Sequence, residues 1–528
     1  MVTTPAIAPG DMTADQLALR TSARVTASTA HGPVVGGRVR NGVQVFLNVP
    51  YGLDVPRWAD PAPLPPSFRY TGEYTADGAY CAQPGRSYTA HIPLRDRLGG
   101  GTPTENPFFA DIYVPSGVDL AAVGAGHPRL PVRVFIHGGF LQFGSTSGQY
   151  NQQFFAAEAR TEVRVLLAHR LSALGFLASA RAGVHGNYGF KDVWLGLEWV
   201  REHIGSFGGD PASVHLSGLS GGAHVVHQLL HRAAALSPAR APFATALLQS
   251  NAILADAVAP RDREAQFGAF CRALGADPDS PAILAELRDT RRFPTAALVA
   301  AVEAMGHHST FRGVVEPGWI RADQMAFQRG PMGQALAAAG VRAVLAGDVR
   351  DEAAFYALVH DVSAPEDLLP NVARYYPEGV AARLLAAYEP LGAGADAADC
   401  AARLGRALAD GQVHLPVRVL CRDLARALPT IRYAVELVPR ALGTRGVVTH
   451  GSDTALQHLR RSVLAPDEEA AAVAWHDALW GEAARVMDGT FVQRPDDEVL
   501  LLAKDGQVRW AHDWRWEQLR AVEAAVLG

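Results

Sequence analysis

The amino-acid sequence predicts an α/β fold with a large, mostly parallel central sheet that is flanked by helices. Three β-rich runs separated by helical or loop sequence carry this prediction. They are PVRVFIHGG from Pro131, TEVRVLLAHR from Thr161 and SVHLSGLSGG from Ser213. Strands that alternate with helices form parallel sheets, because each connecting helix crosses back over the sheet. Two more apolar runs, near Leu247 and Val344, extend the expected sheet to five or more parallel strands.

The segments around this sheet have patterns of their own. Residues 32–52 hold two short β-branched runs around Asn41-Gly42, a turn pair that favours a tight hairpin, so a small N-terminal antiparallel hairpin is expected. Residues 1–30 are expected to form an N-terminal extension that is partly disordered, and 31–528 a single domain. Within that domain, alanine-rich stretches at about 260–340 and 355–425 have helix-compatible spacing and are expected to be helical insertions that cap the sheet.

Composition and charge exclude several classes of function. The 528-residue chain is 48% hydrophobic and 19% charged, which is ordinary for a globular protein with a large core. Its formal net charge is −5 and its basic residues are scattered, so no nucleic-acid partner is expected. No signal peptide pattern and no apolar run of about 18 residues is visible, so we expect no membrane span and a cytoplasmic location. A secreted form whose leader has been removed would look the same.

The cysteines give no sign of a disulfide framework or a metal site. The chain has four of them, Cys81, Cys271, Cys400 and Cys421, and no two form a C-x-x-C pair. Free cysteine is among the most buried residue types, so these are interpreted as buried thiols rather than ligands. Neither a metal ion nor an organic cofactor is expected, because the acyl-enzyme chemistry considered below requires none.

One short motif carries the chemistry. Gly218-Leu219-Ser220-Gly221-Gly222 matches G-x-S-x-G, and it stands between the strand-like VHLS and the helix-like AHVVHQLL, which is the context that the motif demands. A nucleophile on a tight strand-to-helix turn has a strained backbone, and flanking glycines let the chain close around it. The motif and its context make Ser220 the candidate nucleophile. The alternative is that this segment is a glycine-rich turn with a surface serine.

The surrounding sequence resembles a known family. Residues 207–224, FGGDPASVHLSGLSGGAH, are similar to the type B carboxylesterase and cholinesterase family of the α/β-hydrolase superfamily. Three further segments match in the family's order and spacing: HGGFLQFGS, HRLSALGFL and GNYGFKDVWLGLEWV. The resemblance is continuous from about 32 to 255 and patchier to about 460. It implies an α/β-hydrolase fold with helical insertions over the active site, and a serine esterase that acts on small-molecule esters.

The resemblance also implies the partners of the serine. A serine nucleophile needs a base within hydrogen-bond reach and an acid that orients the base, and in this fold the order is Ser, acid, His. The family's acid segment corresponds to VLAGDVRDEAAF and implies Glu352, with Asp351 and Asp348 as alternatives. Its histidine segment corresponds to GVVTHGSDTALQHL and implies His450.

An oxyanion hole needs preorganised N–H donors. Alignment of HGGFLQFGS to the family's glycine-rich loop implies the backbone amides of Gly139, Phe140 and Gly221. Phe140 stands where the family has a third glycine, so its side chain either narrows the acyl pocket, alters the path of the loop, or packs beneath it. Further candidates for the substrate pocket are Phe143, Trp319 and His224, which lies one helical turn past Ser220; His224 is interpreted as packing or pocket lining.

Other departures from the family separate the functional hypotheses. Leu219 replaces the glutamate that commonly precedes the serine. The stretch 81–107 has no tryptophan, and Pro107 stands where the disulfide partner of Cys81 is expected, which argues against a cholinesterase. The leading hypothesis is carboxylic ester hydrolysis through an acyl-enzyme. The alternatives are hydrolysis of a lactone, carbamate or amide of a bulky natural product or xenobiotic by the same triad, and a non-catalytic binding protein of this family. The natural substrate and the oligomeric state stay open.

Overall fold

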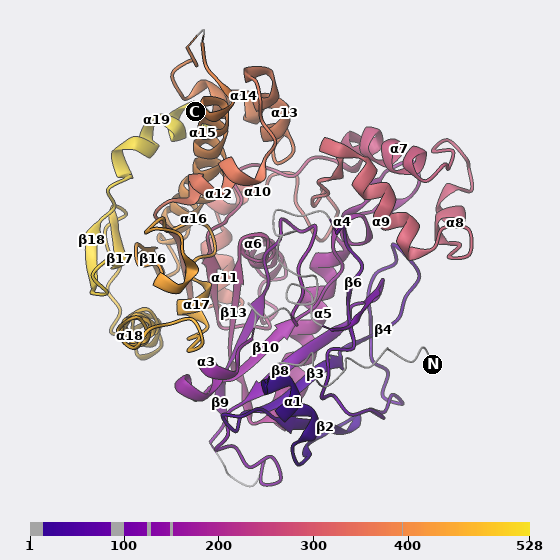
Figure 1. The fold of residues 1–528 in the computed structure, drawn as a ribbon, viewed down its shortest axis with the longest axis vertical. Coiled ribbons are helices and arrows are strands. Elements are labelled where there is room, and N and C mark those ends of the chain that lie inside the picture. Colours follow the sequence, from indigo (N-terminus) through magenta and orange to yellow (C-terminus); the bar gives the residue numbers. More distant parts are fainter. Residues whose placement is uncertain (1–13, 86–99, 124–127, 148–151, 393, 528) are drawn as a thin grey trace. The chain divides into compact units, whose positions relative to one another are not determined.

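A computed structural model of the chain describes residues 14–85, 100–123, 128–147, 152–392 and 394–527 (Figure 1). The chain divides into two compact units, each built from several stretches of sequence. Unit 1 comprises Met1–Ser217, Pro242–Ala244 and Pro260–Val314. Unit 2 comprises Gly218–Ala241, Thr245–Ala259 and Val315–Gly528. Each unit has its own strands and helices and is described by itself.

Unit 1 is built on a mixed sheet. Antiparallel pairs join β1 to β2, β2 to β3, β3 to β8 and β8 to β10, and a parallel pair joins β10 to β9. The expected hairpin is confirmed, with Gly42 at φ +87° in the turn between β2 and β3. The antiparallel part is larger than that hairpin, because β1 and β8 flank it. The strands are β1 (Val25–Thr29), β2 (Gly32–Arg38), β3 (Gln44–Pro50), β8 (Phe109–Val114), β10 (Val163–Leu167), β9 (Leu130–Ile136) and most of β13 (Gly209–Leu219), with the short pairs β4 (Gly52–Leu53) and β5 (Ala62–Pro63), β6 (Ala79–Cys81) and β7 (Thr102–Thr104), and β11 (Ala178–Ser179) and β12 (Val184–His185).

The helices of unit 1 include the central α5, which is buried over most of its length. A buried ion pair joins it to the segment after β10, because the Arg170 guanidinium lies 2.6 Å from the Asp192 carboxylate. This contact ties together two of the segments that resemble the esterase family. The described helices of the unit are α1 (Ala14–Thr21), α3 (Phe154–Arg160), α4 (Ser172–Phe176), α5 (Tyr188–His203), η3 (Ile204–Phe207), η4 (Pro260–Arg263), α7 (Glu264–Ala273), α8 (Ile283–Arg288), α9 (Thr295–Ala304) and η5 (Gly306–Ser309).

Unit 2 holds a sheet that is parallel apart from its last strand. The predicted strands near Leu247 and Val344 pair side by side in parallel, with Gln249 opposite Gly347. The strands are β14 (Thr245–Gln249), β15 (Ala343–Val349), β16 (Thr430–Val435), β17 (Glu498–Leu502) and the antiparallel β18 (Val508–His512). The helices are α6 (Gly221–Ala235), α10 (Gln324–Arg329), α11 (Met332–Ala338), α12 (Glu352–Val359), η6 (Pro365–Asp367), α13 (Leu368–Ala373), α14 (Glu378–Ala386), α15 (Ala397–Ala409), the π-helical η7 (Asp410–His414), α16 (Leu415–Leu424), η8 (Arg440–Leu442), α17 (Thr454–Gln457), α18 (Pro466–Asp488) and α19 (Trp516–Leu527).

Both expected insertions are helical in the structure. The stretch 260–340 contains η4 through α11, and 355–425 contains most of α12 through α16. Only part of the expected N-terminal extension lies within the described residues. Residues 14–30 are ordered as α1 and β1, because β1 pairs along its whole length with β2. Residues 1–13 lie outside the described residues.

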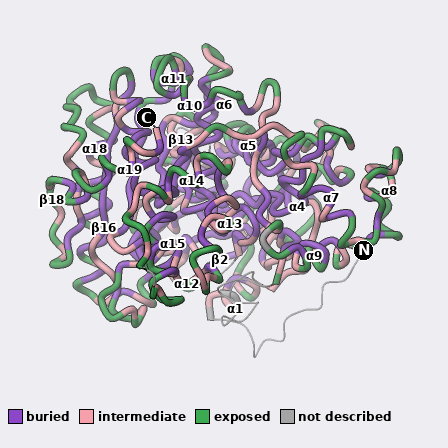
Figure 2. The backbone as a smooth tube through the Cα atoms, turned by 90° about the horizontal axis from the view of Figure 1, so that it is seen from above, coloured by how far each residue is buried: buried purple, intermediate pink, exposed green. Residues whose placement is uncertain are grey.

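The buried residues, purple in Figure 2, are concentrated in the strands and the central helices. Every residue of β14, β15 and β16 is buried. All four cysteines are buried, as predicted, and all four are free; burial raises the pKa of the Cys81 and Cys421 thiols to about 12. In the described part of the chain no helix is long and apolar enough to cross a membrane.

Candidate active site

Ser220 lies between the last residue of β13 and the first residue of α6. Its backbone has φ +57° and ψ −121°, outside the ordinary regions for a side-chain-bearing residue. The amide of Ser220 donates to the Gln249 carbonyl at 2.8 Å, which ties the turn to β14. A methyl group on Gly218 would lie 2.4 Å from the Gly222 carbonyl oxygen, so this close turn requires glycine. The strained turn predicted from G-x-S-x-G is therefore present.

Glu352 and His450 form a buried pair. His450 Nδ1 lies 2.6 Å from Glu352 Oε2, and the Glu352 side chain is fully shielded from solvent. Glu352 opens α12 directly after β15, and its other oxygen accepts from the Val349 amide at 3.3 Å. Among the described residues, His450 Nε2 has no hydrogen-bond partner. The imidazole is thus held through one nitrogen, while the other is unengaged.

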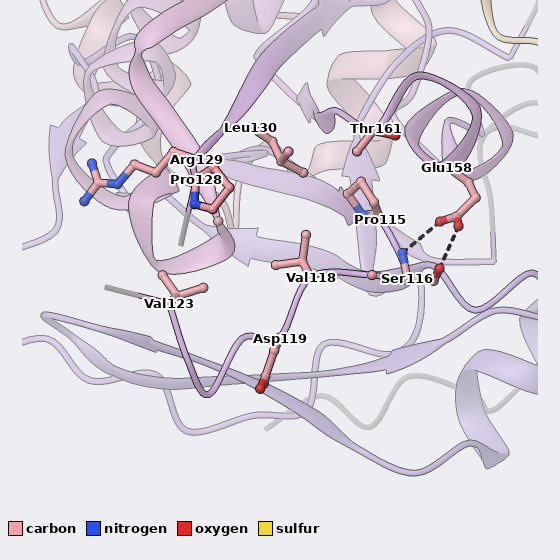
Figure 3. Close-up of a pocket in the computed structure, with 12 residues that line it drawn as sticks. Pro115, Ser116, Val118, Asp119, Val123, Pro128, Arg129, Leu130, Glu158 and Thr161 are labelled. Atoms are coloured by element: carbon pink, nitrogen blue, oxygen red, sulfur yellow. Dashed lines mark hydrogen bonds between the residues drawn. The ribbon is translucent and has the colours of Figure 1, made fainter. Parts of the chain in front are cut away.

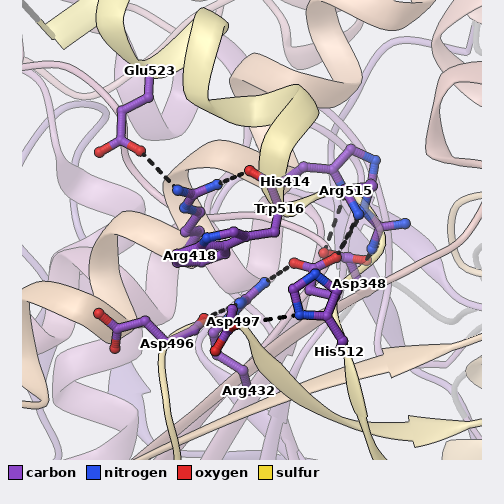
Figure 4. A network of polar contacts seen from close by, with 11 residues as sticks. Asp348, His414, Arg418, Arg432, Asp496, Asp497, His512, Arg515, Trp516 and Glu523 are labelled. Atoms are coloured by element: carbon purple, nitrogen blue, oxygen red, sulfur yellow. Dashed lines mark hydrogen bonds and ion pairs between the residues drawn. The ribbon is translucent and has the colours of Figure 1, made fainter.

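The structure separates Glu352 from the two aspartates that the sequence left as alternatives. Asp348 forms an ion pair with Arg515 inside the network shown in Figure 4, and His414 Nδ1 lies 3.3 Å from its other oxygen. Asp351 accepts from Arg350 and from the Val448 amide, each at 2.8 Å. Of the three acids, Glu352 is the one in contact with His450.

The segments that carry Ser220 and His450 lie side by side. Leu219 precedes the serine and Gly451 follows the histidine, and a methyl group on Gly451 would lie 3.7 Å from Leu219 Cδ2. A hydrogen bond between Ser220 and His450 themselves is not formed, since Nε2 has no partner among the described residues. Catalytic hydrogen bonds are often long in an unliganded site and tighten when substrate binds.

Phe355 and Asp453 interact with this pair and were missed by the sequence analysis. Phe355 stacks on the His450 ring, with centroids 4.6 Å apart and an interplanar angle of 22°. It follows Glu352 by one helical turn on α12, so the three-residue spacing was a signal for it. Both residues therefore approach His450 from one face of the same helix.

The second is Asp453, which follows His450 by three residues. Burial and then the charge of Glu352 raise the pKa of the Asp453 carboxyl to about 6. Its Oδ1 has no hydrogen-bond partner among the described residues. The charge of His450 acts in the opposite direction and lowers the pKa of the same carboxyl. His450 is thus under the influence of two carboxyl groups, of which Glu352 alone is hydrogen-bonded to it.

The predicted oxyanion loop in unit 1 has a strained backbone. Gly139 has φ +119°, and a methyl group there would lie 1.8 Å from the Phe143 carbonyl oxygen. Phe140 and Leu141 follow with φ +56° and +69°. Consecutive left-handed residues with side chains are rare and cluster at functional sites. Phe140 itself thus adopts the left-handed conformation.

Two buried glutamines, also missed by the sequence analysis, hold this loop. Gln142 Nε2 donates to the Phe140 carbonyl at 2.9 Å and to the Phe311 carbonyl at 2.7 Å. Gln83 exchanges two hydrogen bonds with the backbone of Gly144, at 2.7 and 2.8 Å. These contacts fix a backbone that glycine alone would leave flexible.

The predicted pocket residues lie in different places. In unit 1, Phe140 and Phe143 form an edge-to-face pair with centroids 6.2 Å apart. In unit 2, His224 is buried in the first turn of α6, and its amide donates to the Ser220 carbonyl at 3.0 Å. Trp319 stacks on the Arg232 guanidinium in the last turn of α6, about 18 Å along the helix from Ser220. The structure therefore does not bring Trp319 to the serine.

Other polar features do not resemble a reaction centre. His137 and His169 stack with centroids 4.9 Å apart, and burial lowers the pKa of His169 to about 3, so this pair stays neutral. A cavity of about 360 Å³ in unit 1 (Figure 3) lies beside the end of β8 and the start of β9, at the opposite end of β9 from Gly139. In the described ranges, no group of three or more His, Cys, Asp or Glu side chains is arranged to hold a metal ion.

Comparisons with known proteins identify the family. The sequence profile of the Carboxylesterase family matches residues 21–457. The chain belongs to the carboxylesterase family. An uncharacterized esterase/lipase of Schizosaccharomyces pombe is 28% identical over 499 residues, which is 89% of each chain. The para-nitrobenzyl esterase of Bacillus subtilis is 32% identical over 234 residues, 43% of each chain.

The structure agrees with this assignment. The solved structure of a PNB esterase superposes on the structure of this chain with a TM-score of 0.73 at 20% sequence identity. The superposition covers 94% of this chain and 99% of the PNB esterase chain. The α/β-hydrolase fold expected from the sequence is therefore confirmed. The carboxylesterase is a serine hydrolase that acts on ester bonds, and its substrates belong to the class of small-molecule esters.

Proposed function

We propose that this carboxylesterase cleaves carboxylic esters through an acyl-enzyme on Ser220, with His450 as the base and Glu352 as the orienting acid. The observation that carries the proposal is the buried contact of 2.6 Å between His450 Nδ1 and Glu352 Oε2, which leaves Nε2 unengaged. A carboxylate bonded to Nδ1–H places the free lone pair on Nε2, the nitrogen that must take the serine proton.

The first half of the reaction forms the acyl-enzyme. His450 Nε2 takes the proton of Ser220 as Oγ attacks the ester carbonyl carbon. The negative charge on the carbonyl oxygen is stabilised by backbone amides. The Gly221 amide is proposed as one donor, and the amides of Gly139 and Phe140 stay predictions from the sequence. When the tetrahedral intermediate collapses, His450 gives the proton to the departing alkoxide, which leaves as an alcohol. Glu352 stabilises the imidazolium throughout.

The second half repeats these steps with water as the nucleophile. His450 takes a proton from water, the hydroxide attacks the acyl carbon, and Ser220 regains its proton as the acid leaves. The strained backbones of Ser220 and of the Gly139–Leu141 turn support this assignment, because proteins retain such strain mainly at functional sites.

The proposal is tested by intact-mass detection of a covalent adduct with a fluorophosphonate probe. We expect one adduct on the wild type and none on Ser220→Ala. Ser250→Ala is a matched control, because Ser250 is also buried, has φ +54° and follows a strand of the same unit. Labelling of Ser220→Ala at the wild-type rate would remove Ser220 from the mechanism.

Matched substrates test the bond that is cleaved. An ester, a lactone, a carbamate and an anilide with the same acyl or alkyl groups should be compared by kcat/KM. We expect the ester to be preferred, because an alkoxide is a better leaving group than the nitrogen of an amide, which must be protonated before it can depart. Cleavage of the anilide as fast as the ester would contradict the esterase assignment while leaving the triad intact.

A further inference from the structure

The loop that carries His450 is long and has little regular structure. It runs from the end of β16 at Val435 to the start of α17 at Thr454, and η8 is its one helical turn. Arg445 and Gly446 both have positive φ, at +52° and +85°. A loop of this length does not fix a side chain by its own geometry. The short contact between His450 and Glu352 therefore needs support from outside the loop.

Asp351 supplies a direct connection between the two segments. Its amide donates to the Val448 carbonyl at 2.9 Å, and its Oδ2 accepts from the Val448 amide at 2.8 Å. Asp351 immediately precedes Glu352, and the fully buried Val448 precedes His450 by two residues. This reciprocal pair thus joins the backbone beside the acid to the backbone beside the base.

Arg350 reinforces the same connection. Its guanidinium lies 2.8 Å from Asp351 Oδ2 and donates to the Gly446 carbonyl at 3.0 Å. Its own amide donates to the Val435 carbonyl at 3.1 Å, where β16 ends. Burial raises the pKa of the Asp351 carboxyl, but the hydrogen bonds from Arg350 and Val448 outweigh it and hold this pKa below its usual value. The carboxylate that accepts from Val448 is therefore charged at neutral pH.

The turn before Asp351 is anchored on its other side. Asp348, at the end of β15, pairs with Arg515. The surrounding network in Figure 4 reaches α19, where the guanidinium carbon of Arg418 lies 3.4 Å from the centroid of the Trp516 ring. The residues on both sides of this turn are therefore held by side-chain contacts, Asp348 by Arg515 and Asp351 by Arg350 and Val448.

We propose that Asp351 is a positioning residue, which holds the His450 loop against the turn that carries Glu352 and so maintains the histidine–carboxylate contact. This inference rests on the proposed function, since it assigns to Asp351 the alignment of the same base. The contacts of Asp351 are with Arg350 and Val448, so it is assigned an effect through the position of His450. Misplacement of a catalytic group by about 1 Å costs on the order of 10²-fold in rate, so a loss of alignment is measurable.

The test compares Asp351→Ala and Asp351→Asn with a matched control in the full chain. Asparagine keeps an oxygen that can accept from the Val448 amide, but it loses the charge that faces Arg350. The control is Asp396→Ala, which removes a carboxylate that accepts from the Asp399 amide at 2.9 Å, at the start of α15. It therefore deletes the same kind of contact away from the His450 loop.

The expected result is a fall in kcat on the order of 10- to 100-fold for Asp351→Ala, a smaller fall for Asp351→Asn, and a KM within about twofold. Asp396→Ala should keep the wild-type kcat. Proton NMR gives a second readout, because the proton on His450 Nδ1 resonates at low field when it lies in a short bond to a carboxylate. This signal, absent from His450→Ala, should broaden or move upfield in Asp351→Ala.

Two results overturn the inference: wild-type kcat with an unchanged low-field signal in both Asp351 variants, or an equal loss of kcat in Asp396→Ala. If Asp351→Ala does not fold, the inference is tested with Asp351→Asn and Arg350→Ala. Wild-type kcat in both of these variants would refute the positioning role of Asp351. Failure of the proposed function can be distinguished from failure of the role of Asp351. If the proposed function is wrong, Ser220→Ala retains labelling or activity, whatever the Asp351 variants show.

Discussion

Replacement of Glu352 by glutamine is the sharpest perturbation of the proposed mechanism. Glutamine has nearly the same shape and stays beside His450, but it carries no charge. The carboxylate that it replaces is fully buried and lies 2.6 Å from His450 Nδ1. Water therefore cannot stabilise the positive charge of His450 in place of the carboxylate. The loss of charge should lower the rate of the chemical step.

The magnitude follows from the geometry of this pair. In the transition state His450 carries a positive charge whose centre lies about 4 Å from that of the carboxylate. At an effective dielectric constant of about 20, the attraction is about 4 kcal/mol. That corresponds to a loss of about 10³-fold in kcat. The amide can also donate to Nδ1 and favour the wrong tautomer, which extends the expected loss toward about 10⁴-fold.

The assay is steady-state hydrolysis of a p-nitrophenyl ester by the wild type, Glu352→Gln and a control glutamate variant. Glu482→Gln is the control, because Glu482 is also buried in unit 2 and is paired with Arg485 on α18. We expect the loss in Glu352→Gln to lie in kcat, with KM nearly unchanged, since the charge is needed in the transition state. Glu482→Gln should retain the wild-type kcat.

A kcat of Glu352→Gln within tenfold of the wild type would refute this reasoning. The neighbouring Asp453→Asn then becomes decisive, because Asp453 is the other buried carboxyl group coupled to His450. A loss of about 10³-fold in Asp453→Asn, with a mild effect in Glu352→Gln, would transfer the role of the orienting acid to Asp453.

Two further predictions concern residues that the sequence did not single out. Phe355→Leu removes a ring stacked 4.6 Å from His450, and because such pairs are worth about 0.5–1.5 kcal/mol, kcat should fall about 2- to 10-fold; a change in KM alone would contradict this. Burial raises the pKa of Asp111 to about 7, so between about pH 4 and 7 the folded state binds the proton that the unfolded state has lost. The free energy of unfolding should therefore fall by up to about 4 kcal/mol as pH rises through that range, and Asp111→Asn should remove this fall in urea titrations; an unchanged slope would rule out Asp111 as its source.

Local pattern was sufficient for the central strands. The five runs named from the sequence correspond to β9, β10, β13, β14 and β15, because each is a β-branched or apolar run bounded by helical or loop sequence. The extent of the antiparallel part was not visible, since β8 finds its partners β3 and β10 through contacts distant in sequence. The same holds for β16 and β17, whose parallel partners lie far away along the chain.

The site shows the same division between local and distant information. The strained turn at Ser220 could be predicted, because its glycines and its strand-to-helix context are contiguous in sequence. The choice among Asp348, Asp351 and Glu352 could not be derived from spacing, since all three lie within five residues. What distinguishes them is their partners, which are distant in sequence: Arg515 comes from the C-terminal segment, and Val448 and His450 come from one loop.

Leu219, where much of the family has glutamate, lies next to the loop that carries His450, because a methyl group on Gly451 would lie 3.7 Å from Leu219 Cδ2. In the same loop, burial and then the charge of Glu352 raise the pKa of the Asp453 carboxyl. Like charges in one region disfavour each other's ionised form. An apolar side chain at 219 therefore adds no further carboxylate to a region where two carboxyl groups already repel each other.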